Sequence, residues 1–124
     1  MSKTVLLVHD ETVVVDIAKR KLEAMGFKAL CAHDGQEAID ILQTEKPDLI
    51  ILDVQMPNMN GYTFLTELRK HPNSSVAATP VVIVSAYAET NPIFTRHGIK
   101  AYLLKPLKLE ELVDKVQEFL GVAK

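Results

Sequence analysis

The chain has 124 residues, of which 48% are hydrophobic and 24% charged, and its formal net charge is -2. This length is enough for one domain with one core, and the interspersed charges exclude the basic stripe of a nucleic-acid-binding protein. No apolar run approaches the roughly 18 residues that a membrane span requires. The single cysteine, Cys31, excludes an internal disulfide and fits a reducing cytoplasm, where we expect this protein.

Short apolar runs, which favour strands, alternate along the chain with amphipathic segments, which favour helices. In chain order, we expect a strand at Thr4–Val8, a helix at Glu11–Met25, a strand at Phe27–Ala32, a helix capped by Asp34, a strand at Asp48–Asp53, a helix opening at Asn60 or Gly61, a polar loop at His71–Thr79, a strand at Val81–Val84, at best a short helix within Ala86–Gly98, a strand at Ala101–Leu104 and a helix at Leu109–Leu120. This alternation predicts an α/β fold whose parallel sheet is covered by helices on both faces. We expect a single domain over residues 1–124, without an output domain.

Two helices carry apolar stripes at helical spacing, which should face the sheet. The last helix is the clearer case, because its apolar residues form one continuous stripe. The first stripe consists of Val14, Ile17, Ala18, Leu22 and Met25, and the last of Leu109, Leu112, Val113, Val116, Phe119 and Leu120.

Polar side chains stand just beyond four of the expected strands. His9 and Asp10 follow the first, Asp53 ends the third, Ser85 follows the fourth and Lys105 follows the fifth. In a parallel sheet these ends meet at the carboxyl edge, where open α/β sheets bind ligands. Two close carboxylates repel each other unless a cation or a proton intervenes, and Mg²⁺ prefers such oxygen ligands together with phosphate. The ammonium and hydroxyl suit a phosphoryl group, so the residues predict a metal-assisted phosphoryl site without deciding which carboxylate is attacked.

Four motifs stand in order at these strand ends: Val8–Glu11, Leu52–Gly61, Val84–Ala86 and Tyr102–Pro106. With them the chain resembles the receiver domain of two-component response regulators over essentially its whole length. The resemblance implies a flavodoxin-like, three-layer (βα)5 fold with strand order 2-1-3-4-5. It also implies a phosphoprotein that catalyses its own phosphorylation and dephosphorylation and is not an enzyme on an external substrate.

The resemblance also implies roles for individual residues. Asp53 would accept a phosphoryl group from a sensor histidine kinase or a histidine phosphotransfer protein. Asp10, Asp53 and the backbone carbonyl of Gln55 would hold Mg²⁺, with Mn²⁺ as an alternative ion. Ser85 would bind a phosphoryl oxygen, and Lys105 would pair with the phosphoryl group.

A conformational switch follows from the same resemblance. Tyr102 matches an aromatic position that moves inward on activation, and the Lys105–Pro106 peptide bond would be cis. Phosphorylation would then shift a population toward the active state. The switched surface would serve a downstream protein partner or a homodimer.

His9 departs from the family pattern, because an acidic residue usually stands there. The replacement removes a negative charge and adds a group that can itself become cationic. We therefore expect weaker Mg²⁺ binding than in a typical receiver. A sharper hypothesis has His9 contributing a nitrogen ligand to a Mn²⁺ site.

A second departure is the segment Tyr87–His97, which is shorter than usual and contains Asn91-Pro92. A short or irregular fourth helix there would alter the usual output surface.

Two other functions stay open. The first is a pseudo-receiver, an interaction module whose metal binding and phosphorylation are impaired by His9. The second is a flavin-binding electron carrier, although the loop after the first strand lacks the Ser, Thr and Gly residues that cradle an FMN phosphate.

Overall fold

The computed structural model describes residues 3–10, 12–53, 61–85, 99–105 and 108–121. Its elements, in chain order, are β1 (Thr4–Val8), α1 (Thr12–Ala24), β2 (Lys28–Ala32), α2 (Gly35–Ile41), β3 (Leu49–Asp53), α3 (Gly61–Arg69), α4 (Ser74–Ala77), β4 (Val81–Ser85), β5 (Ile99–Leu104) and α6 (Leu109–Leu120). Among these described helices, none combines the length and the apolar character that crossing a membrane would require.

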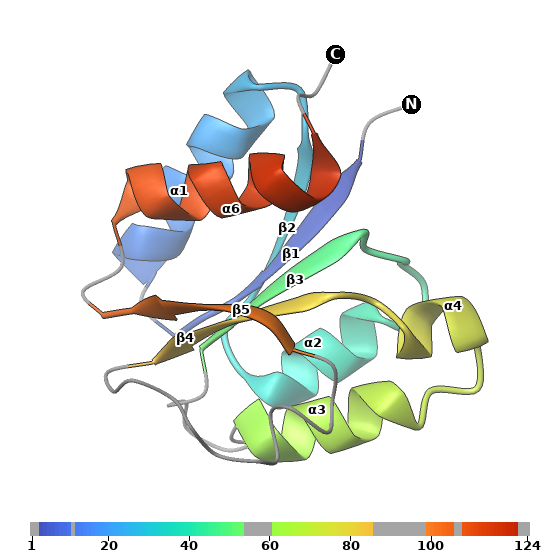
Figure 1. Ribbon diagram of the computed structural model, residues 1–124. Coiled ribbons are helices and arrows are strands. Elements are labelled where there is room, and N and C mark those ends of the chain that lie inside the picture. Colours follow the sequence, from blue (N-terminus) through green and yellow to red (C-terminus); the bar gives the residue numbers. More distant parts are fainter. Residues whose placement is uncertain (1–2, 11, 54–60, 86–98, 106–107, 122–124) are drawn as a thin grey trace.

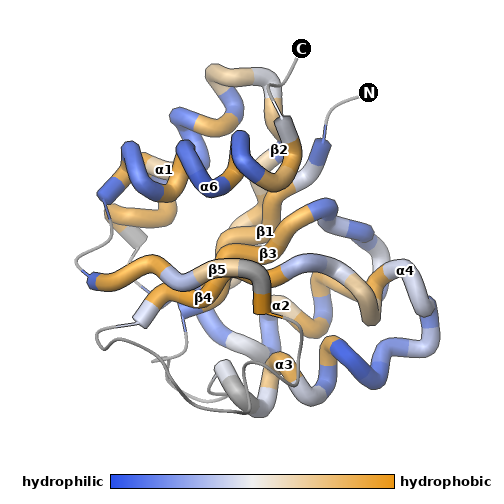
Figure 2. Tube along the Cα trace, in the orientation of Figure 1, coloured by the Kyte–Doolittle hydropathy of each residue, from blue (hydrophilic) through white to orange (hydrophobic). Residues whose placement is uncertain are grey.

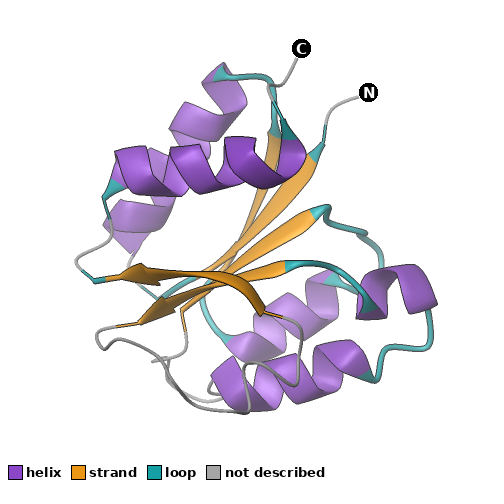
Figure 3. Ribbon diagram, viewed as in Figure 1, coloured by secondary structure: helices purple, strands orange, loops and turns teal. Residues whose placement is uncertain are grey.

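The strands form one parallel sheet in the order β2-β1-β3-β4-β5, which confirms the predicted topology. Figure 1 shows α1 and α6 on one face and α2 and α3 on the other, so the architecture has three layers. In Figure 3 the arrowheads of the strands point toward the same side. The polar residues that follow the strands are thereby brought to one edge.

The sheet separates two hydrophobic cores. Alternate residues of β1 point to opposite faces, as a strand requires: Leu6 and Val8 belong to the core under α2 and α3, and Val5 and Leu7 to the core under α1 and α6. The strands β3 and β4 are buried along their whole length. Figure 2 shows the same pattern, with hydrophobic strands at the centre and hydrophilic outer helix faces.

The buried face of α1 differs from the predicted stripe. Val15, Ala18 and Leu22 are each at most 2% exposed, whereas Ile17 is 50% exposed. The sequence was ambiguous because the three valines at positions 13–15, together with Ile17, offer overlapping apolar stripes. Packing against the sheet selects the stripe that begins at Val15, and it leaves Val13 and Ile17 on the surface.

The prediction of a polar loop at His71–Thr79 was wrong in part, because this segment contains the helix α4. The side chain of Asn73 caps its first turn. Arg69 Nη1 donates hydrogen bonds of 2.9 and 2.7 Å to two main-chain carbonyls at and just after the C-terminal end of α4, those of Ala77 and Thr79. A helix of one turn is too short to show apolar periodicity, and it is held by these side-chain bonds instead.

Other local predictions are confirmed. Asp34 caps α2, since its Oδ1 accepts a hydrogen bond of 2.8 Å from the amide of Glu37. Gly26, directly after the predicted helix Glu11–Met25, has φ 96°, a conformation that glycine adopts without strain and that suits the end of a helix. The predicted helix within residues 86–98 lies outside the described residues.

Candidate functional site

The ends of four neighbouring strands bring the predicted site residues to the carboxyl edge of the sheet. Val8 pairs with Leu52 in register, so His9 and Asp10 leave β1 beside the end of β3. Beyond β5, the amide of Lys105 still donates a 2.8 Å hydrogen bond to the carbonyl of Ser85. The parallel pairing therefore positions residues that are far apart in sequence within one small region.

Asp53 is the last residue of β3 and is 0% exposed. Its Oδ2 lies 3.0 Å from Lys105 Nζ, and the lysine side chain is 23% exposed. A buried carboxylate is costly unless a cation accompanies it, and this ammonium provides one through a charge-assisted hydrogen bond. The family resemblance implied that Lys105 would pair with a phosphoryl group, and in the structure its ammonium lies against the Asp53 carboxylate.

His9 lies between two carboxylates. Its Nε2 is 3.6 Å from Asp53 Oδ2, and its Nδ1 is 3.7 Å from Asp10 Oδ1. The His9 side chain is 6% exposed, whereas that of Asp10 is 38% exposed. His9 and Lys105 therefore approach the same oxygen of Asp53, a convergence that the sequence does not reveal.

His9, Asp10 and Asp53 form a potential metal site. Each offers one ligand atom, and these atoms lie within 4.8 Å of one another. The two carboxylates fit Mg²⁺, which prefers oxygen ligands. The imidazole does not share that preference, because ring nitrogen favours later first-row metals. Gln55, the third predicted ligand, lies outside the described residues, as does Pro106 of the predicted cis peptide.

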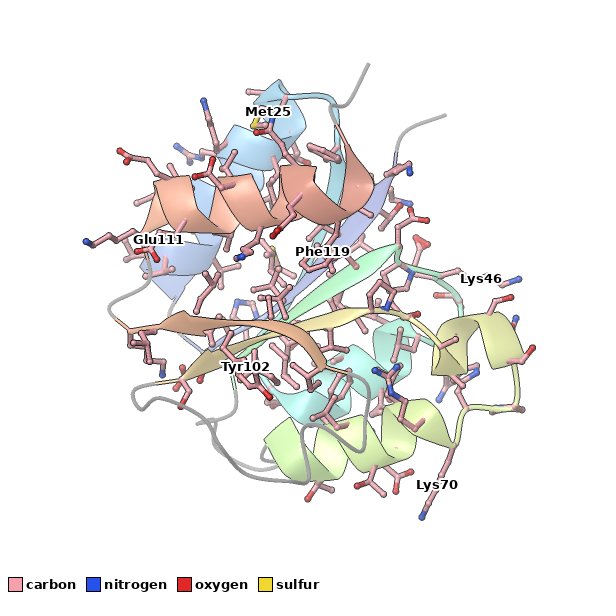
Figure 4. The ribbon with its side chains drawn as sticks, viewed as in Figure 1. Met25, Lys46, Lys70, Tyr102, Glu111 and Phe119 are labelled. Atoms are coloured by element: carbon pink, nitrogen blue, oxygen red, sulfur yellow. The ribbon has the colours of Figure 1, made fainter. Side chains whose placement is uncertain are left out.

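Ser85 and Tyr102 occupy the two strands that continue the sheet beyond β3. Ser85 is 3% exposed and follows Val84, the register partner of Asp53. Tyr102 lies on the edge strand β5, where Figure 4 labels it, and is 38% exposed. Leu104, on the same strand, is 52% exposed, and the sequence had not predicted an exposed leucine at this position. Ser85 thus lies on the strand next to β3, and Tyr102 on the strand beyond it.

Comparison with known proteins gives one consistent result. The family model described as "Response regulator receiver domain" matches residues 5–117. Among curated relatives, the transcriptional regulatory protein CrdR of Helicobacter pylori is 31% identical over 98% of this chain, which spans 56% of CrdR. The chain spans about half the length of the first curated relatives that it matches.

Solved structures agree with this result. The chemotaxis protein CheY4 of Vibrio cholerae is 30% identical with a TM-score of 0.84, over 97% of this chain and 100% of that one. The receiver domain of the sensor histidine kinase PA1611 of Pseudomonas aeruginosa is 26% identical with a TM-score of 0.80, over 98% and 99% of the two chains. That structure has a magnesium ion coordinated in its active-site cleft.

Proposed function

The chain belongs to the family of response regulator receiver domains of two-component systems, and from that premise we propose that it accepts a phosphoryl group on Asp53. The donor would be a phosphohistidine on a sensor histidine kinase or on a histidine phosphotransfer protein. The acceptance would require a divalent cation, Mg²⁺ or Mn²⁺, and would take place in the cytoplasm. Phosphorylation would switch a surface that contacts a downstream protein or a second copy of the chain.

One observation carries this proposal: Asp53 is wholly buried at a strand end, with Lys105 Nζ 3.0 Å from its Oδ2. Such a carboxylate contributes nothing to the apolar core, and its burial costs free energy. A position that keeps it there together with a cation is typical of a reactive group. Asp10, which lies across His9 from Asp53, supplies the second carboxylate that a metal ion would need.

The reaction follows from these groups. An oxygen of Asp53 attacks phosphorus, a new O–P bond forms, and the P–N bond of the phosphohistidine breaks, with the departing imidazole taking a proton from water. Lys105, already paired with the carboxylate, neutralises charge that moves onto the phosphoryl oxygens. Ser85 would donate its hydroxyl hydrogen to one of those oxygens.

Mg²⁺, when bound, would supply further neutralisation of the phosphoryl charge. Asp10, Asp53 and, by the family resemblance, the main-chain carbonyl of Gln55 would hold it. Tyr102, whose residue on β5 is 38% exposed, would report the outcome by moving inward once Ser85 binds phosphate.

The decisive experiment is intact-protein mass spectrometry after incubation with Mg²⁺ and acetyl phosphate. We expect a mass gain of one phosphoryl group in the native chain and none in Asp53→Asn. The matched control is Asp40→Asn, which removes an exposed carboxylate on α2. A gain that persists in Asp53→Asn would exclude Asp53 as the acceptor.

A second function, a pseudo-receiver that binds partners without phosphorylation, is favoured by one observation. His9 occupies a buried position beside both carboxylates, where a further acid usually stands. On this alternative, neither Mg²⁺ nor Mn²⁺ would support a mass gain. The same experiment therefore distinguishes the two functions, and His9→Asp should restore phosphorylation if the pseudo-receiver reading is correct.

A further inference from the structure

We propose that His9 is a metal ligand, and that the site formed by His9, Asp10 and Asp53 prefers later first-row divalent ions, such as Co²⁺ and Zn²⁺, over Mg²⁺. This inference deepens the proposed function and rests on its metal site. It concerns the identity of the ion and not the transfer of the phosphoryl group. The chemical basis is that imidazole nitrogen favours these ions, whereas Mg²⁺ favours oxygen.

The spacing of the donor atoms is close to what a single ion requires. Two ligands at about 2.1 Å from one ion lie about 3.0 Å apart in octahedral and about 3.4 Å apart in tetrahedral geometry. His9 Nε2 lies 3.6 Å from Asp53 Oδ2, which is within a few tenths of an ångström of the tetrahedral spacing. One ring cannot give both of its nitrogens to the same ion, so the third ligand would come from Asp10, since one atom each of His9, Asp10 and Asp53 lies within 4.8 Å of the others.

The imidazole is also held in place. Leu7, Val15 and Ile51 line a small apolar pocket beside the ring. The His9 side chain is 6% exposed, so most of its surface is already packed against protein. A ligand that is already positioned loses little conformational freedom when the ion binds.

The charge of the site points in the same direction. An acid at position 9 would give three carboxylates, whereas this chain has two beside a histidine. Lys105 Nζ, 3.0 Å from Asp53 Oδ2, offsets part of the remaining negative charge. Mg²⁺ depends mostly on such charge, so its binding is weakened. An ion that bonds well to nitrogen regains affinity through His9.

The test compares two ions in three tag-free proteins at one fixed pH. Calorimetric titrations with Mg²⁺ and Co²⁺ give the ratio of the two dissociation constants for the native chain, His9→Asp and His33→Gln. His33 is the matched control, because it also lies near a carboxylate, Glu37 at 3.3 Å, but on the surface. We expect the preference for Co²⁺ over Mg²⁺ to fall by about tenfold or more in His9→Asp and to stay unchanged in His33→Gln.

A second measurement needs no variant. Pulsed electron paramagnetic resonance of the Mn²⁺-loaded native chain detects a directly bonded imidazole nitrogen, and we expect that signal. Its absence, or an equal ion preference in the native chain and His9→Asp, would overturn the inference. Phosphorylation with Mg²⁺ is read separately by mass, so its loss with nitrogen coordination intact would count against the proposed function alone.

Discussion

Replacement of Lys105 by Met should destabilise the protein by leaving the buried carboxylate of Asp53 without its ammonium partner. Methionine keeps the unbranched stem and removes the charge. At 3.0 Å and an effective dielectric constant of about 20, the lost Coulomb attraction is about 5–6 kcal/mol. Part of this attraction is offset in the native protein, because the lysine gives up hydration on folding and solvent screens its side chain, which is 23% exposed. We therefore expect the free energy of unfolding to fall by about 2–3 kcal/mol.

Chemical denaturation with urea, followed by circular dichroism in a metal-free buffer, measures this loss. In a separate heating experiment, the thermal midpoint should fall by about 10 °C for a chain of this size. The double variant Asp53→Asn/Lys105→Met removes both charges and should recover most of the stability, because no unpaired buried charge is left. A single variant within about 0.5 kcal/mol of the native chain, or a double variant less stable than the single one, would refute this reasoning.

Three further predictions concern residues outside the site. Burial raises the pKa of the Cys31 thiol, so the folded chain has less thiolate near neutral pH than the unfolded chain. Iodoacetamide should therefore label the folded chain more slowly than the urea-unfolded chain. Equal labelling rates would contradict this expectation. Arg69→Met should cost about 1–3 kcal/mol, because two main-chain carbonyls at the end of α4 lose their donor, and unchanged urea midpoints would show that these bonds contribute little. Val15→Ala should cost at least about 1 kcal/mol and Ile17→Ala clearly less, since Val15 is 2% and Ile17 50% exposed; the reverse order of stabilities would show that the buried face of α1 is misassigned.

The fold followed from the sequence because its local patterns are strong and agree with one another. The run Leu49–Asp53 is apolar until its last residue, which indicates a central strand that ends in a carboxylate. Asp34 and Gly26 mark helix ends by chemistry that acts within a few residues. The motif order from Val8 to Pro106 then indicated the family, which the match over residues 5–117 confirms.

The predictions that failed were those in which local pattern leaves more than one solution. Three consecutive valines allow two inward faces for α1, and only contact with the sheet decides that Val15 is buried and Ile17 is exposed. The helix α4 has one turn and no periodicity, and it depends on Arg69, which reaches it from α3. Both outcomes depend on tertiary contacts that no window of the sequence contains.

Local hydrophobic pattern specifies the strand ends, and with them the residues that reach the carboxyl edge, namely Asp10, Asp53, Ser85 and Lys105. How closely these residues approach one another depends on contacts between distant parts of the chain. The registers of β1 with β3, of β3 with β4 and of β4 with β5 put His9 at 3.6 Å and Lys105 at 3.0 Å from one oxygen of Asp53. Distances of this kind depend on the pairing and twist of distant strands, and so the position of His9 beside both carboxylates became visible only in the folded chain.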